Sequence, residues 1–99
     1  MDVIVQVMVS IKEATASAVA FAVEALGPER TVGVRLEEVE SAKVRGQDAW
    51  LITLSMVIPS AGSIVAAHSG TGKREYKTFT VLKSNGEVKS MKIRELADA

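Results

Sequence analysis

The chain has 99 residues, with 12 basic and 12 acidic side chains and no cysteine. The lack of cysteine excludes a disulfide scaffold and any cysteine-ligated zinc site. The balanced charge excludes the broad cationic field on which non-specific nucleic-acid binding usually depends. A hydrophobic content of 47% together with 24% charged residues predicts one folded domain over residues 1–99 rather than a disordered chain.

The apolar side chains are numerous but mostly small. Valine and alanine make up more than half of them, and the aromatic residues are Phe21, Trp50, Tyr76 and Phe79. A domain of this size buries only roughly 60–65% of the surface of its unfolded chain. So much apolar surface therefore predicts a second copy that covers part of it, as a homodimer or higher homo-oligomer, with a protein or peptide partner as the other candidate.

The apolar stretch over residues 3–26 does not match a signal peptide or a membrane span. A signal peptide begins with positive charge, whereas Asp2 precedes this stretch and Gln6, Lys12 and Glu13 interrupt it. No window reaches the roughly 18–20 apolar residues that cross a bilayer. We expect a soluble, cytoplasmic protein without a membrane span.

The first segment, residues 2–9, has apolar residues on both faces of an extended chain. Val3, Val5 and Val7 share one face, and Ile4 and Met8 lie on the other. Such a segment must be covered on both sides. We predict a strand or arm that pairs either within its own chain or with another, which makes the three valines candidate interface residues.

A helix is predicted over residues 11–26. Ser10 and Glu13 have the spacing of a capping box, in which each side chain accepts a hydrogen bond from the other residue's backbone N–H. Gly27 can take the left-handed position after the last turn, and Pro28 cannot continue the helix.

The faces of this helix leave two interpretations open. Ile11, Val19, Val23 and Leu26 project to one side, and Phe21 falls beside the polar stripe opposite. In the first interpretation Phe21 is a partly exposed aromatic that lies over neighbouring alanines. In the second, an interface for a partner or a second copy is formed by Phe21, Ala14, Ala18 and Ala25.

Alternating apolar residues predict an antiparallel sheet over residues 31–96. We expect strands at 31–44, with a bulge or bend near 38–41, at 49–58, at 76–82 and at 88–93. Residues 45–48 form a turn and residues 59–73 a flexible loop. The strand at 49–58 is placed centrally, with its even-numbered residues facing the helix.

The turn between the last two strands decides which side chains share a face. A two-residue Asn85-Gly86 turn separates Phe79 from Met91, whereas a three-residue loop with Gly86 left-handed places both on one face. Core formation favours the second. The predicted fold is α+β: one helix on a four-stranded antiparallel meander of cystatin-like shape, with a possible extra N-terminal strand.

Three segments carry a resemblance to a known family. They are WLITL at 50–54, REYKTFTV at 74–81 and SNGEVKSM at 84–91. They resemble the pattern of PepSY-like domains, in which W-x-I-x-L is followed by Y-x-x-F-x-V, a turn with G-E-V and a closing strand. The resemblance covers residues 11–96, although the loop after Pro59 is longer than the pattern. It implies a non-catalytic binding or inhibitory module and transfers no catalytic residue.

The chemistry-bearing residues form no recognisable catalytic set. His68 is the only histidine and lies in a glycine-rich stretch, whereas a general base needs a fixed partner. The stretch at 70–73 has alanine and arginine where a phosphate-binding loop needs glycine and Ser or Thr. Only Glu38 and Glu40 of the glutamate run share a strand face, which is typical of a solvated edge. We expect no catalytic residue, no cofactor and no metal.

Charge is unevenly distributed along the chain. Residues 1–50 carry 5 basic and 8 acidic side chains, and residues 51–99 carry 7 and 4, which suggests complementary pairing within or between chains. Six basic residues could line one end of the last hairpin: Lys73, Arg74, Lys77, Lys89, Lys92 and Arg94. Aromatic stacking groups are scarce among them, so nucleic acid is not the expected partner.

These observations predict a small non-enzymatic binding or interaction domain that works as a homo-oligomer. The alternative is an enzyme or small-molecule site between the helix and a curved sheet, lined by Trp50 and Tyr76 and covered by His68.

Overall fold

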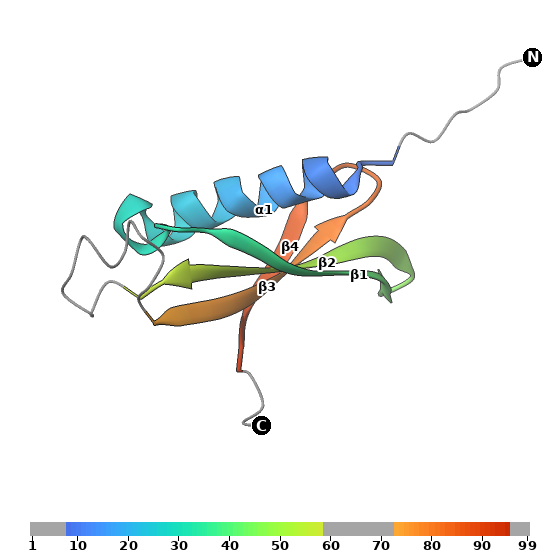
Figure 1. The fold of residues 1–99 in the computed structure, drawn as a ribbon. Coiled ribbons are helices and arrows are strands. Elements are labelled where there is room, and N and C mark those ends of the chain that lie inside the picture. Colours follow the sequence, from blue (N-terminus) through green and yellow to red (C-terminus); the bar gives the residue numbers. More distant parts are fainter. Residues whose placement is uncertain (1–7, 59–72, 96–99) are drawn as a thin grey trace, which may run out of the picture.

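The computed structural model describes residues 8–58 and 73–95, and its one long helix lies on one side of a four-stranded antiparallel sheet (Figure 1). The elements are α1 (Ile11–Leu26), the 3-10 helix η1 (Pro28–Arg30), β1 (Arg35–Val44), β2 (Gln47–Val57), β3 (Arg74–Leu82) and β4 (Val88–Arg94). The strands lie in the order β1-β2-β3-β4. The α+β meander predicted from the sequence is confirmed, and most of the expected N-terminal strand lies outside the described residues.

The two ends of α1 follow from local sequence. The Ser10 hydroxyl accepts from the Glu13 N–H (3.1 Å), and the Ser10 N–H donates to the Glu13 carboxylate (2.9 Å), which confirms the capping box. These hydrogen bonds lower the pKa of Glu13 below its ordinary value, the one from the Ser10 backbone most. At the other end Gly27 has a positive φ of 87°, as predicted, but its ψ of 159° is extended rather than left-handed helical.

The face of α1 that packs on the sheet is its small-residue face. Ala14, Ala18 and Ala22 are fully buried, whereas the larger Ile11 and Val23 are 44% and 41% exposed. Alanines spaced four residues apart form a flat row along one side of a helix, and such a row lets the backbone approach the sheet closely. Ile11 lies on the same side as these alanines, three residues before Ala14, and is exposed at the first turn of α1, whereas Val23 projects away from the row.

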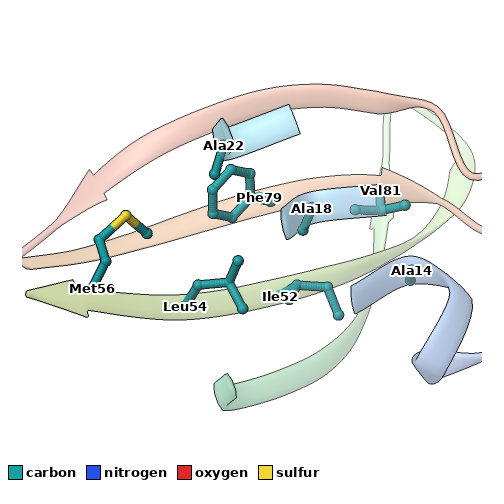
Figure 2. Close-up of a cluster of buried hydrophobic side chains, with 8 residues drawn as sticks. All are labelled: Ala14, Ala18, Ala22, Ile52, Leu54, Met56, Phe79 and Val81. Carbon is teal, nitrogen blue, oxygen red and sulfur yellow. The ribbon is translucent and has the colours of Figure 1, made fainter. Parts of the chain in front are cut away.

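The core between helix and sheet contains eight fully buried side chains (Figure 2). The helix contributes its three alanines, and the strands contribute Ile52, Leu54, Met56, Phe79 and Val81. Phe21 packs at the edge of this cluster, with its ring 6.3 Å from that of Phe79 and nearly perpendicular to it. Phe21 therefore makes an aromatic contact within its own chain, and an interface through its exposed part stays a prediction.

The first hairpin closes through a tight turn. Val44 pairs with Gln47, and the two residues between them, Arg45 and Gly46, have φ values of 52° and 79°. Positive φ at both positions is the feature of a type I′ turn, whose twist matches that of the flanking strands. The predicted bulge is present but lies between Leu36 and Glu38, slightly before the expected 38–41.

The second hairpin places the expected residues on one face by a different route. Phe79 pairs with Met91 on the helix side, as predicted, and Gly86 has the expected positive φ of 76°. The loop, however, spans residues 83–86, because the Leu82 N–H donates to the Glu87 carbonyl (2.9 Å). A loop of this length alone would place Phe79 and Met91 on opposite faces of the sheet. A register shift between Thr80 and Val81 returns them to the same face.

Candidate functional site: the open face of the sheet

The face of the sheet opposite α1 carries a mixture of hydroxyl, aliphatic and charged side chains. We call it the open face, because no helix of the described residues lies on it (Figure 1). Its central residues are those that alternate with the core residues of β2 and β3: Leu51, Thr53, Ser55, Val57, Tyr76, Thr78, Thr80 and Leu82.

One end of the open face is covered by Arg74. Its Nε donates to the Ser55 hydroxyl (2.8 Å), and its Nη2 donates to the carbonyls of Ser55 (3.3 Å) and Gly33. Ser55 is fully buried and donates in turn to the Glu37 carboxylate (2.6 Å). Burial lowers the pKa of Arg74, nearby Arg35 acts in the same direction, and Glu37 opposes them. This end is a polar network in which the Nη1 of Arg74 is buried without a hydrogen-bond partner among the described residues.

The middle of the open face is bridged by Arg94. Its Nη1 donates to the Thr53 hydroxyl (3.2 Å) and forms an ion pair with Glu38. Because Arg94 belongs to β4 and Glu38 to β1, this ion pair joins the two outer strands across the open face. The Thr53 and Thr78 hydroxyls, 2.9 Å apart, are hydrogen-bonded beneath it. A small hollow of about 170 Å³ remains beside Glu38, Glu40 and Arg94.

The remaining end is open and forms a concavity of about 550 Å³. Its aliphatic part consists of Val44, Leu51 and Leu82, which come from the first hairpin and the end of β3. Thr80 and Ser90 add hydroxyls that are hydrogen-bonded to each other (3.0 Å). The volume falls within the range of about 300–1,000 Å³ that small-molecule sites occupy.

Three cations stand at this concavity, and no carboxylate is among its lining residues. Arg45 comes from the β1–β2 turn, and Lys89 and Lys92 come from β4. Lys89 forms a half-exposed ion pair with Glu87 (3.5 Å). Neither Arg45 nor Lys92 has an ion-pair partner within residues 8–58 and 73–95. The open end therefore has a positive potential above an aliphatic floor.

The residues predicted to line a pocket do not come together. Trp50 lies on the helix side, where its Nε1 donates to the Val9 carbonyl (3.0 Å) and the Lys83 ammonium stands 3.9 Å from its ring centre. Tyr76 pairs with Ser55 and so lies on the open face. The two aromatic residues lie on opposite sides of the sheet, because Trp50 pairs with Val81 and successive residues of β3 alternate between the two faces, which places Val81 and Tyr76 on different faces. His68 lies outside the described residues.

The predicted interface on the helix is also divided. Ala14 and Ala18 are fully buried against the sheet, so they cannot contact another chain, whereas Ala25 is exposed and Phe21 packs on Phe79. Ala14 and Ala18 are covered because the small-residue face of α1 packs on the sheet. The remaining candidates lie outside the described residues: Val3, Val5 and Val7.

The six basic residues of the last hairpin do not form one surface. Lys77 is only 6% exposed and lies on the helix side, with its ammonium 3.8 Å from the Glu75 carboxylate. Arg74 and Arg94 are engaged in the networks described above, and Lys73 is exposed just before β3, which leaves Lys89 and Lys92 at the open end. The alternation of faces along β3 separates Arg74 from Lys77 and follows from the sequence. The shape of the concavity has no signal in the sequence.

Within the described ranges, no helix has the length and apolar character needed to cross a membrane, and no three potential ligand side chains gather to hold a metal ion. Comparisons of the chain with protein-family models, curated proteins and solved structures found no match. The PepSY-like resemblance therefore stays a prediction.

Proposed function

We propose that the chain is a small non-enzymatic binding domain whose ligand site is the open end of the open face. The observation that carries this proposal is the concavity of about 550 Å³, in which aliphatic side chains and three cations meet. A few polar groups around an apolar floor are the usual composition of a ligand site. The PepSY-like resemblance supports the same class, since it implies a binding module.

The hydroxyl groups of the open face support binding rather than nucleophilic catalysis. Ser55 is fully buried between Glu37 and Arg74. Thr53 and Thr78 are hydrogen-bonded to each other, and Thr53 also accepts from Arg94. A nucleophile must be exposed to substrate and activated by a base, and Ser55 does not meet the first condition.

An NMR titration of the full chain tests the site. The probes are small apolar molecules that carry a carboxylate, a neutral hydroxyl or an amine, added one at a time to the ¹⁵N-labelled protein. We expect at least one of them to shift the amide signals of Val44, Leu51, Thr80 and Ser90 together. If the bound probes instead shift only amides of α1, or if none of them binds, the proposal is wrong.

A second candidate function is self-association, which the charges of the two edge strands favour. β1 carries Glu38 and Glu40 on the open face, and β4 carries Lys92 and Arg94. Like charges oppose pairing of β1 with β1 or of β4 with β4 in another copy, whereas β4 and the β1 of a second copy are complementary. Ile93, 76% exposed on the helix side of β4, supplies apolar surface for the same contact.

The mass in solution tests this second candidate. Size-exclusion chromatography with light scattering should give a multiple of 10.5 kDa at micromolar concentration. Reversing the charge of Glu40 with Glu40→Lys should lower that mass. A mass near 10.5 kDa for the unsubstituted chain excludes self-association as its mode of action.

A further inference from the structure

We infer that the concavity takes a small amphiphilic anion: one negatively charged head group, a carboxylate or a phosphate, on a compact apolar body. The inference rests on the proposed function and adds to it the chemical class of the ligand. It is carried by the contrast between the cationic rim and the aliphatic floor of the same concavity.

The distribution of charge on the open face sets the sign and the length of the ligand. Arg45, Lys89 and Lys92 border the concavity. The neighbouring hollow is bordered by Glu38, Glu40 and Arg94, and because Arg94 pairs with Glu38 it keeps one excess negative charge. An anion is therefore attracted at one end of the face and repelled a short distance away. A long polyanion that extends toward β1 meets these carboxylates, so the site favours a single head group.

The floor determines the rest of the ligand. Val44 and Leu51, both partly exposed, offer aliphatic surface beside the buried Leu82, and the hydroxyls of Thr80 and Ser90 already bond to each other. A sugar or another polar body would lose its hydrogen bonds to water without finding enough replacements. An apolar body instead removes aliphatic surface from water at no such cost.

Arg45 supplies an independent observation. It is the one non-glycine residue with positive φ among the described residues, at the first central position of a type I′ turn. Asn, Asp and Gly are the residues that this position favours. An arginine placed there against local preference keeps a guanidinium at the rim, where it can form two hydrogen bonds with a carboxylate or phosphate.

The test compares probes that share one apolar body. Isothermal titration of the full chain with octanoate, octyl phosphate, octanol and octylamine separates charge from hydrophobicity, and acetate and inorganic phosphate report the head groups alone. We expect octanoate or octyl phosphate to bind at least tenfold more tightly than octanol, and the better of the two identifies the head group. Added salt should weaken this binding.

Matched substitutions locate the charge effect. Lys92→Gln removes a rim cation and should weaken binding of the anionic probe about two- to fivefold, the effect of one surface charge pair. Lys43→Gln makes the same change in net charge on the helix side of β1, where Lys43 pairs with Asp48, and should leave binding unchanged. Arg45→Asn should weaken binding as Lys92→Gln does while the unfolding midpoint stays the same or rises.

The outcomes separate this inference from the function on which it rests. If octanol or octylamine binds as tightly as the anionic probes and shifts the amides of the open face, the anion specificity is wrong and the binding site stands. If Lys43→Gln weakens binding as much as Lys92→Gln, the rim cations are not the cause and the inference is again wrong. If no probe shifts these amides, both the inference and the proposed function fail.

Discussion

Replacing Phe21 by alanine tests whether this ring belongs to the core of its own chain. Phe21 is partly buried and meets Phe79 edge to face at 6.3 Å. A fully buried phenylalanine loses roughly 3–5 kcal/mol on truncation to alanine. An aromatic pair of this geometry accounts for about 0.5–1.5 kcal/mol beyond burial. For a ring at the edge of the core we expect Phe21→Ala to lower the free energy of unfolding by about 2–3 kcal/mol.

Urea unfolding at two protein concentrations, tenfold apart, measures this loss. In thermal unfolding, the same loss of about 2–3 kcal/mol should lower the midpoint temperature of a domain of this size by roughly 10–20 °C. Val23→Ala on the exposed side of α1 is the control and should change stability by less than about 0.5 kcal/mol. The reasoning is refuted if Phe21→Ala costs no more than this control, or if its effect depends on protein concentration, as expected for a residue in an interface.

Three further predictions concern the ends of α1 and one turn. Ser10→Ala should cost about 1 kcal/mol in urea unfolding, because it removes the acceptor for the Glu13 N–H. Because hydrogen bonds from Ser10 lower the pKa of Glu13 in the folded state, the stability that this carboxylate contributes is present above its ordinary pKa and is lost as the pH falls through the lowered one. Unfolding measured over a pH series should show this loss, and Glu13→Gln should not. Gly27→Ala should cost about 1–3 kcal/mol, since its φ of 87° and ψ of 159° suit only glycine and a Cβ there stands 3.3 Å from the Glu29 carboxylate. Gly46→Ala, with open space around its Cβ, should cost less than Gly27→Ala, and the reverse order would contradict the account of Gly27.

The features predicted well from sequence are those decided by neighbouring residues. The capping box of Ser10 and Glu13 and the positive φ of Gly86 need no tertiary information. The alternation of β2 placed Ile52 and Leu54 on the helix side, because parity follows directly from strand geometry. These are local constraints that many folds share.

The orientation of α1 was not predictable from the pattern of large apolar residues. Such a pattern directs bulk toward the core, but here the fully buried residues of α1 are alanines such as Ala18, and small side chains let a helix lie close to a sheet. Val23 projects away from this row and is 41% exposed. The choice depends on how closely two layers approach, which is a property of the assembled fold.

The candidate site was predicted least well, because it depends on curvature. The ion pair between Arg94 and Glu38 joins two residues that are 56 positions apart in the chain. No local pattern in the sequence indicates that these two side chains meet. Trp50 and Tyr76 are predicted pocket residues because they are aromatic, but the pairing of β2 with β3 places them on opposite faces of the sheet. Lys89 and Lys92 belong to the six basic residues of the last hairpin, and the sequence does not distinguish them from the other four.

The central claim is that the open face of the free protein is available to a ligand. Methyl NMR signals of the full chain, recorded with a soluble paramagnetic gadolinium chelate, test it most directly. The account predicts strong broadening for Val44 and Leu51, which line the concavity, and little for Leu54 and Val81, which are fully buried under α1. If Val44 and Leu51 are protected as well as Leu54, another segment or a second copy covers the face, and the binding site proposed here is contradicted.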